Sequence, residues 1–444
     1  MNKPRYLTQA AIIAALYAVL THMQNLLLPG SATWAIQMRI SEAMTVLAFF
    51  TPAAIPGLSL GCLVFNLTYA GTLPLDFLVG TLATFLAALA MWKTRNVKIG
   101  KLPLLGLVMP AVTNAFLVGW ELTVYIGGGT PSALPAPLMK TLLEKLSAVL
   151  TGEKTQEFTV ECNPGTVDED FLSMLHEQGV NRLSFGVQSF DDAVLQRIGR
   201  IHTGKEAERA FSMARKAGFA NLSLDLMYGL PGQTLEMLQA SVERALELKP
   251  SHISMYGLQI EKGTVFASMQ AAGRLHLPED ETAEAMYDYM AEALPAAGYE
   301  RYEISNFARP GCESRHNLSY WQDVPYLGLG AAAHSYLDGQ RWKAEKDIPA
   351  YIKAAEQGGR IIEPEELRTE AVAMEEFSFL ALRTAAGISR EHFARRFGCT
   401  LDSMYSQAIE KLRRQGLLED TGQAVRLTPL GMKYGNWAFA EFLL

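Results

Sequence analysis

Two kinds of hydrophobic pattern divide the chain near residue 120. Before that point, apolar residues run almost without interruption through stretches separated by proline and glycine, at 6–28, 43–51, 53–70, 74–92 and 102–120. Successive apolar runs with almost no charge are typical of membrane-spanning helices and not of a soluble core. We therefore expect residues 1–121 to form all-α transmembrane helices with about five spans.

From residue 122 the pattern changes to short β-rich runs that alternate with amphipathic helices. Strands are predicted at 122–126, 157–161, 182–187, 221–225 and 253–257, and helices at 137–150, 168–178, 204–217, 234–247 and 282–297. This alternation is the signature of βαβ units on a parallel sheet. It predicts an incomplete α/β (βα) barrel over residues 122–365.

The last part of the chain, residues 366–444, has a third pattern. Three helices are expected at 367–382, 390–397 and 401–417, followed by a turn-rich stretch at 419–427 that resembles a wing. The pattern predicts a small winged-helix-like domain. Such a pattern often binds DNA, but apart from Lys411, Arg413 and Arg414 no helix here is strongly basic, so an accessory domain without a nucleic-acid partner is expected.

Charge follows the same division. Residues 1–120 have a net charge of +5, and because the whole chain carries −7, the remainder carries −12. The front is apolar and basic, and the rear has the composition of an acidic cytosolic protein. The cysteines (Cys62, Cys162, Cys312 and Cys399) are too widely spaced for a disulfide framework or a metal motif, so no metal site is predicted.

Several polar residues interrupt the apolar front, among them Gln37, Arg39 and Glu42. Burial of an ionisable group in the membrane costs free energy, so such residues usually belong to a functional site. The alternative is that Arg39 and Glu42 form an ion pair at the start of a helix. The run 36–43, with 49–57 after it, resembles the QueT family of energy-coupling-factor (ECF) transporter S components, which take up queuosine precursors. The resemblance implies that Gln37, Arg39 and Glu42 lie near the substrate pocket.

The first apolar stretch carries two rows of small residues at helical spacing, Ala10, Ala14 and Ala18 in one and Ala11 and Ala15 in the other. Such a row permits close approach of another helix. The QueT resemblance implies that this other helix belongs to the transporter's membrane T component, and packing within the chain is the alternative. Basic residues near the N-terminus place that end in the cytoplasm, and a fifth span would carry Glu121 to the outer side of the membrane.

Polar residues follow several predicted strands of the rear. The run 127–132 places three glycines directly after a strand, where the backbone can approach an anionic ligand. Other candidates stand at or after strand ends: Glu161, Gln188, Arg200 and Asp225. Each by itself could be a helix cap or a surface residue. Because parallel strands bring their carboxyl ends to one edge, together they describe a polar cleft.

The rear resembles the HemW family of heme chaperones, which belongs with the oxygen-independent coproporphyrinogen III oxidases in the radical S-adenosylmethionine (SAM) superfamily. The resemblance covers about 122–444 and is carried by the runs 127–132, 161–165, 183–190, 225–232 and 302–311. It implies a SAM cleft formed by Gly128, Gly129, Thr130, Glu161, Gln188, Arg200 and Asp225.

The run 316–321 matches the family's segment linked to heme binding, with His316, Asn317, Tyr320 and Trp321. An imidazole is a common axial ligand of heme iron, and aromatic rings pack well against a porphyrin. A loop histidine beside core aromatics is the alternative. The resemblance favours heme as a ligand, with a heme-acceptor protein as partner.

The family holds a [4Fe–4S] cluster through Cys-x-x-x-Cys-x-x-Cys, and that spacing does not occur in these 444 residues. We therefore expect no catalytic residues and no cluster chemistry. The first hypothesis is a HemW-like heme-binding protein in the cytoplasm, tethered to the lipid bilayer by its front. The alternatives are a membrane S component that binds a queuosine precursor, an active coproporphyrinogen III oxidase, and a gene rearrangement that joined two truncated modules.

Overall fold

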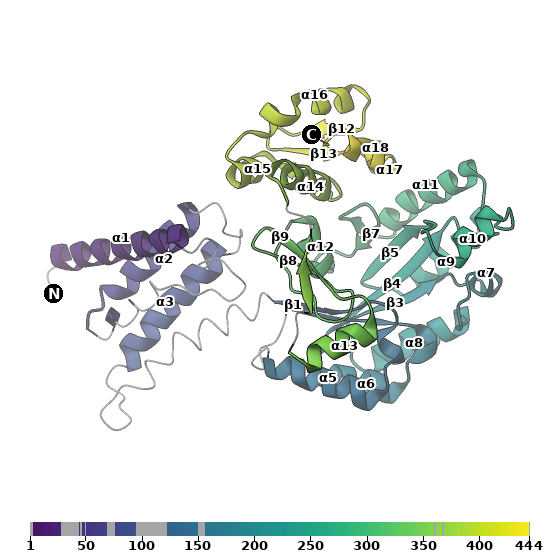
Figure 1. Cartoon of the computed structure of the whole chain (residues 1–444), viewed down its shortest axis with the longest axis horizontal. Coiled ribbons are helices and arrows are strands. Elements are labelled where there is room, and N and C mark those ends of the chain that lie inside the picture. Colours follow the sequence, from purple (N-terminus) through teal and green to yellow (C-terminus); the bar gives the residue numbers. More distant parts are fainter. Residues whose placement is uncertain are drawn as a thin grey trace. The chain divides into compact units, whose positions relative to one another are not determined.

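The computed structural model describes residues 3–27, 44, 47–48, 50–68, 76–94, 122–149, 156–358, 361–365 and 368–443. The chain divides into two compact units. The first comprises Met1–Leu122, Ala148–Gln156 and Pro325–Glu366. The second comprises Thr123–Ser147, Glu157–Val324 and Leu367–Leu444. Figure 1 shows the helices within residues 3–94 in purple to blue-violet and the parallel strands of the second unit in blue to teal.

The described front of the chain is helical, as the apolar pattern predicts. It contains α1 (Lys3–Leu27), α2 (Ala54–Thr68) and α3 (Asp76–Thr94). Among the described residues, one helix is long and apolar enough to cross a membrane, over Pro4–Gln24. The predicted stretch 102–120 and the candidate residues Gln37, Arg39 and Glu42 lie outside the described residues.

Helix α1 packs closely against α2 through its small residues. A Cβ atom on Gly57 would come within 2.8 Å of the Ala10 carbonyl oxygen, and one on Gly61 within 2.7 Å of the Ala14 carbonyl oxygen. Only glycine on α2 permits this separation of the two backbones. Of the two alternatives for the Ala10 and Ala14 row, packing within the chain is therefore the one present in this structure.

The other face of α1 stays apolar and exposed. The exposed fractions of its large side chains are 55% for Ile12, 50% for Leu16, 53% for Val19 and 54% for Met23. The described residues of the first unit also include a small antiparallel sheet in the order β10-β9-β8 and the helix α13. These elements are β8 (His334–Leu337), β9 (Gln340–Ala344), α13 (Ile348–Glu356) and β10 (Ile362–Pro364).

The second unit is built on a sheet in the order β1-β2-β3-β4-β5-β7-β6. Its first five strands are parallel neighbours and match the predicted strands: β1 (Thr123–Ile126), β2 (Glu157–Cys162), β3 (Arg182–Gln188), β4 (Asn221–Tyr228) and β5 (His252–Gly257). The sequence did not predict the antiparallel extension, β6 (Glu300–Arg301) and β7 (Asn306–Ala308), because such short strands leave no alternating pattern.

The two faces of this sheet differ because side chains alternate along each strand. One face is apolar, with residues such as Val160, Phe185 and Leu224 in the core. The helices between strands cover it: α5 (Ala136–Val149), α6 (Glu169–Glu177), α8 (Gly204–Lys216), α9 (Leu235–Glu247) and α11 (Asp280–Ala296). In Figure 1, α5, α6 and α8 follow one another below the strands. The short helices α7 (Asp192–Arg197) and α10 (Val265–Ala271) complete this part.

The opposite face of the sheet is polar. Its positions include Thr159 and Glu161 on β2, Ser184 on β3 and Asp225 on β4. A sheet that is apolar outside and polar inside is the arrangement of a partial α/β barrel whose site lies within its curve. The predicted fold class is confirmed at this level.

Among the described residues, strand β1 is an edge of the sheet and pairs with β2. Helix α12 (Arg315–Trp321) lies against it, with Tyr125 of β1 stacked on His316 of α12. The covering of one side of an edge strand by a helix reduces its tendency to pair with other chains.

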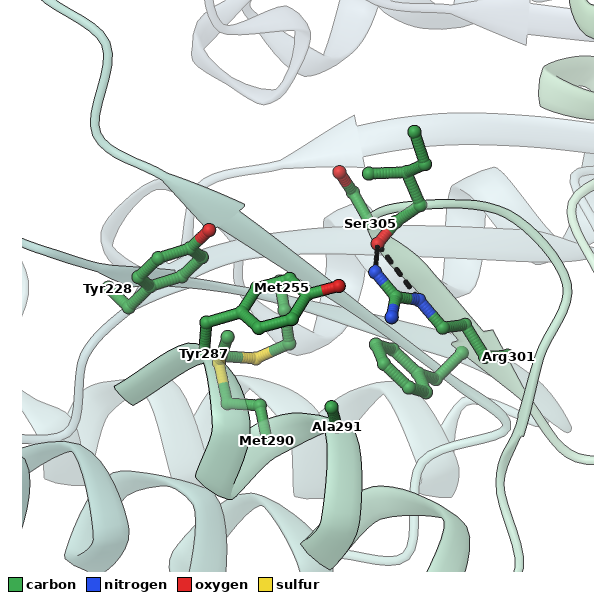
Figure 2. A pocket seen from close by; sticks show the side chains of 9 residues that line it. Tyr228, Met255, Tyr287, Met290, Ala291, Arg301 and Ser305 are labelled. Carbon is green, nitrogen blue, oxygen red and sulfur yellow. Dashed lines mark hydrogen bonds between the residues drawn. The ribbon is translucent and has the colours of Figure 1, made fainter. Parts of the chain in front are cut away.

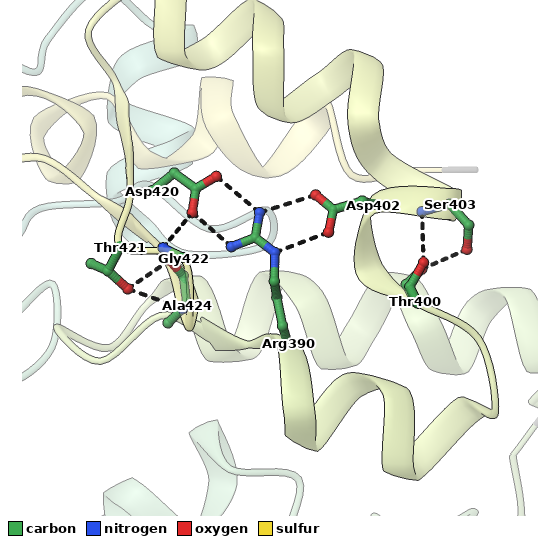
Figure 3. A network of polar contacts seen from close by, with 8 residues as sticks. All are labelled: Arg390, Thr400, Asp402, Ser403, Asp420, Thr421, Gly422 and Ala424. Atoms are coloured by element: carbon green, nitrogen blue, oxygen red, sulfur yellow. Dashed lines mark hydrogen bonds and ion pairs between the residues drawn. The ribbon is translucent and has the colours of Figure 1, made fainter.

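The C-terminal part consists of helices around an antiparallel sheet in the order β11-β13-β12. Its elements are α14 (Glu370–Leu382), β11 (Ile388–Ser389), α15 (Arg390–Phe397), α16 (Leu401–Arg414), β12 (Leu418–Asp420), β13 (Ala424–Leu427), α17 (Pro429–Lys433) and α18 (Gly435–Ala440). Figure 3 shows how Arg390 joins three of them, with paired hydrogen bonds to Asp402 and to Asp420. These bonds to Arg390 lower the pKa of both carboxyl groups.

Candidate functional site

The glycine turn after β1 is shaped by two requirements. Gly128 and Gly129 have φ angles of +83° and +69°, the left-handed region that favours glycine. A Cβ atom on Gly127 would lie 2.5 Å from Cε1 of Tyr125 and 3.0 Å from Cδ of Glu161. The turn therefore approaches these two side chains as closely as a backbone can.

Glu161 fixes the turn from the neighbouring strand. Its Oε2 accepts a hydrogen bond of 3.2 Å from the Gly128 main-chain N–H, and its Oε1 accepts one of 2.5 Å from the Tyr125 hydroxyl. Beside the charged acceptor, burial raises the pKa of Tyr125 well above its usual value, so the phenol stays a donor. No side chain occupies the space next to Gly128 and Gly129, and Thr130 after them is exposed.

Hydrogen bonds join the loops that follow β1, β2 and β3. The Ser132 hydroxyl lies 2.6 Å from that of Thr166 and accepts a bond from the Asn163 N–H. The Asn163 side chain in turn lies 3.2 Å from Nδ1 of His202, whose Nε2 lies 3.1 Å from the Val187 carbonyl oxygen. The strand ends that carry the candidate residues are thereby held at one edge of the sheet.

Gln188, Arg200 and Asp225 converge over Gly186. A Cβ atom there would lie 3.1 Å from Nε2 of Gln188 and 3.6 Å from Nη2 of Arg200, and Gly186 pairs with Asp225 across the sheet. Gln188 has a φ of +67°, next to a register shift in the strand pairing. Its Oε1 is buried and has no hydrogen-bond partner among the described residues, which suits a site that receives a donor from a ligand.

The charges in this cleft are strongly influenced by burial. Burial raises the pKa of Asp225 to about 6, against the lowering effects of a hydrogen bond from Ser254 and of the Arg182 charge. Ser184 donates to both oxygens of Asp225, at 3.2 and 3.3 Å. Burial lowers the pKa of Arg200, and Asp225 partly offsets that. The cleft can therefore offer a cation and carboxylates to a polar ligand.

Helix α12 carries the second group of candidate residues and is anchored by β2. The buried carboxylate of Glu157 accepts hydrogen bonds from the main-chain N–H groups of Arg315 (2.9 Å) and His316 (3.1 Å). The Ser314 side chain caps the same turn by accepting from Asn317 N–H. A carboxylate at a helix N-terminus satisfies free N–H groups and interacts favourably with the helix dipole.

The imidazole of His316 lies between two tyrosines. It stacks on Tyr125, with ring centroids 4.4 Å apart and an interplanar angle of 12°. Tyr320 approaches it edge-on, at 4.7 Å and 80°. Among the described residues, the hydrogen bonds of His316 are made by its main chain, so its ring nitrogens are available to a ligand.

Two effects keep this imidazole neutral. Burial, with the nearby charge of Arg182, lowers the pKa of His316 to about 4. Arg182 is 2% exposed, and its Nε has no hydrogen-bond partner among the described residues. A neutral imidazole has a free lone pair, the form that binds a metal.

Trp321 at the end of α12 faces the C-terminal helices. The Arg383 guanidinium lies over its ring at 4.3 Å, and Arg383 also lies 3.5 Å from the buried carboxylate of Glu303. Asp323, just beyond α12, pairs with Arg368 and Arg396. The segment is therefore held on one side by β1 and β2 and on the other by the C-terminal domain.

The structure thus brings the predicted cleft residues to one edge and places the predicted heme segment beside them. Sequence reasoning missed three residues that connect the two, Tyr125, Glu157 and Arg182. Tyr125 looked like an ordinary strand residue. Glu157 and Arg182 each stand at the first position of a predicted strand, where an ionisable residue is common. Their importance comes from the strand register, which turns both side chains toward the polar face of the sheet.

Cys162 does not face this edge. Cys162 is buried in the apolar core on the helix-covered face, and burial raises the pKa of its thiol. In the part of the chain that the structure describes, no group of three or more His, Cys, Asp or Glu side chains could hold a metal ion.

A separate cavity lies between the sheet and α11. Figure 2 shows its lining, with Tyr228, Met255, Tyr287 and Arg301 around it. Its volume is about 30 Å³, room for one or two water molecules. It is far too small for a porphyrin or a nucleoside, so it does not compete with the sheet edge as a site.

Comparison with known families divides the chain as the hydrophobic pattern does. Residues 7–152 match the QueT transporter family, residues 113–245 match the radical SAM superfamily, and residues 369–434 match the HemN C-terminal domain. The first two matches overlap, so the border predicted at residue 121 stays a prediction.

Relatives of the rear part are similar over nearly its whole length. A heme chaperone HemW of Lactococcus lactis is 42% identical over 322 residues, which is 72% of this chain and 84% of that protein. The heme chaperone HemW of Bacillus subtilis is 43% identical over 323 residues, 72% of this chain and 85% of that protein. Among solved structures, coproporphyrinogen III oxidase (HemN) from Escherichia coli, a radical SAM enzyme, is similar in fold. Its TM-score is 0.64 at 22% identity, over 75% of this chain and 80% of that chain.

We predict that Gly127→Ala destabilises the sheet edge, because its Cβ would overlap Tyr125 and Glu161. Overpacking of this kind costs about 1–3 kcal/mol. Hydrogen exchange of residues 123–130 should become faster. Gly165→Ala is the matched control, since its Cβ would meet neighbours at an ordinary 3.4 Å. Equal exchange in both variants would show that the close approach is not required.

Proposed function

The chain belongs to the HemW family, and from this we propose that its rear part binds heme at the α12 segment and passes it to an acceptor protein. His316 supplies the axial nitrogen in this proposal, and Asn317, Tyr320 and Trp321 complete the segment. The observation that carries it is the neutral, stacked imidazole of His316, whose ring nitrogens have no partner among the described residues.

The surroundings of His316 suit heme in chemical terms. Tyr125 and Tyr320 limit rotation of the imidazole, so less conformational entropy is lost when its nitrogen coordinates iron. Aromatic rings next to the imidazole also provide apolar surface for a porphyrin edge. Trp321 is held by Arg383 and presents a rigid indole within the same segment.

The cleft residues fit SAM as a ligand. Open space beside Gly128 and Gly129 leaves room for a ligand, while Glu161 and Asp225 suit donors of a sugar or an amine. We therefore propose Gly128, Gly129, Thr130, Glu161, Gln188, Arg200 and Asp225 as its contacts.

The residues of the described structure do not fit a [4Fe–4S] cluster. Three thiolates would have to point toward the cleft, whereas Cys162 points into the helix-covered core and no group of three His, Cys, Asp or Glu side chains among the described residues could hold a metal ion. We propose that the chain binds its ligands without radical chemistry and has no catalytic residues. The same observation disfavours coproporphyrinogen III oxidase activity.

The front of the chain supports a second role. Because residues 7–152 match the QueT transporter family, we propose that this part lies in the lipid bilayer and anchors the rear, which functions in the cytoplasm. The rear can function in the cytoplasm only if an even number of spans precedes it, so in this proposal the last of the roughly five predicted stretches, 102–120, does not cross. A queuosine-precursor pocket at Gln37, Arg39 and Glu42 and a T component as partner belong to the same proposal. The C-terminal domain is proposed to be a winged-helix-like accessory domain that does not bind nucleic acid.

Heme titration of the purified chain tests the first proposal. His316→Ala should raise the heme Kd about tenfold or more, a loss of roughly 1.4 kcal/mol. His334→Ala, whose side chain is 57% exposed, is the control and should bind like the unmodified chain. Because the neutral form binds iron and the pKa of His316 is lowered to about 4 from 6.5, affinity should be retained from pH 7.5 to pH 5.5. Equal affinity of both variants would remove His316 from the proposal.

Anaerobic reconstitution with iron and sulfide tests the absence of cluster chemistry. We expect no [4Fe–4S] signal by electron paramagnetic resonance and no stoichiometric sulfide. A family member that carries Cys-x-x-x-Cys-x-x-Cys, treated in parallel, is the positive control. A clear cluster signal from this chain would mean that its thiolates gather in a way the proposal denies.

Membrane attachment is tested by washing membranes with alkaline carbonate. The chain should stay in the pellet, and a variant with Ile12→Lys and Leu16→Lys should be partly released, because both exposed side chains of α1 would then place charge in lipid. Full release of the unmodified chain would contradict the proposal.

A further inference from the structure

The structure joins the cleft and the heme segment through one side chain. Tyr125 uses its hydroxyl to bind Glu161 of the cleft and its ring to stack on His316 of α12. The two contacts involve opposite parts of a rigid phenol, so neither partner can move far without disturbing the other.

We propose that Tyr125 is a positioning residue that couples the two sites, so that SAM bound in the cleft strengthens heme binding at His316. The inference rests on the proposed heme function and goes beyond it, since it concerns how one ligand controls the affinity for another.

The cleft side of the coupling depends on Glu161. Its carboxylate has further acceptor capacity beyond the bonds to Tyr125 and Gly128. A ligand that donates to Glu161 can therefore add to these bonds without displacing them. Such a ligand restricts the carboxylate and, through the 2.5 Å hydrogen bond, the tilt of the phenol.

The heme side depends on the stacked pair. Coordination of iron requires the imidazole to hold one orientation. Stacking on Tyr125 sets the plane of the His316 ring, since the angle between the two ring planes is 12°. The backbone of His316 is already fixed by Glu157, so the ring torsions are the freedom that remains. If the phenol is restrained before heme arrives, less entropy is lost on coordination, which gives positive cooperativity.

Coupling between binding sites is reciprocal. SAM should therefore lower the heme Kd, and heme should lower the SAM Kd by the same factor. For a single hydrogen bond and one stacked ring we expect a factor of about 3 to 10.

Two substitutions separate the contacts of Tyr125. Tyr125→Phe keeps the stacked ring and removes the hydroxyl, so the heme Kd should no longer respond to SAM. Tyr125→Leu removes both, so the heme Kd should also rise about tenfold. Tyr289→Phe is the matched control, because it removes a phenol hydroxyl on α11 at the edge of the same core. It should retain the full response to SAM.

The experiment is a heme titration of the full chain in detergent, with and without saturating SAM, followed by the Soret band. SAM binding is measured on the same samples by calorimetry. Thermal unfolding checks that each variant folds. If Y125F did not fold, the reciprocal effect in the unmodified chain would test the coupling, because heme should then lower the SAM Kd by the same factor.

The outcomes are distinct. The inference is supported if the heme Kd of Y125F no longer responds to SAM while the heme Kd of the unmodified chain and of Y289F still does. If both ligands bind the unmodified chain but SAM leaves the heme Kd unchanged or raises it, or if Y125F retains the response, the coupling is wrong and the heme function stands. If heme binds and SAM does not, the coupling is likewise overturned. If heme does not bind at all, the proposed function fails and the coupling fails with it.

Discussion

The inner face of strand β2 carries two carboxylates on which both halves of the site depend. Glu157 accepts hydrogen bonds from the first N–H groups of α12, and Glu161 accepts them from the glycine turn and from Tyr125. Because side chains alternate along a strand, positions 157, 159 and 161 face the same side. One rigid strand therefore sets the position of α12 relative to the cleft.

Burial of this polar face has electrostatic consequences. Arg182 is almost fully buried near Asp225, His252 and His316, and together with desolvation it lowers the pKa of both histidines. Imidazoles in such surroundings stay neutral, and His252 instead takes part in hydrogen bonds with Ser223 and Tyr302. The same burial that would penalise a charged histidine leaves His316 suited to coordinate a metal.

Much of the second unit could be predicted from the sequence. The five parallel strands and their helices follow from alternating apolar patterns, since a strand with one covered face must repeat every two residues. The short strands β6 and β7 could not, because two or three residues carry no period. The division of the front from the rear was equally visible, as a change from uniform to alternating hydrophobicity. The close packing of α1 and α2 depends on Gly57 and Gly61, and the apolar pattern alone does not show that these glycines face another helix.

For the site, the sequence by itself determined the residue types and their chain positions: the glycine turn, Glu161, Asp225 and the segment that begins at His316. The tertiary structure decided which of them meet. Tyr125 and His316 are nearly two hundred positions apart, and no local pattern links them. Their stacking follows from strand register and from the capping of α12 by Glu157, which are contacts between distant segments. Local periodicity specifies which face a residue occupies, whereas the partner across that face is fixed only when the segments pack.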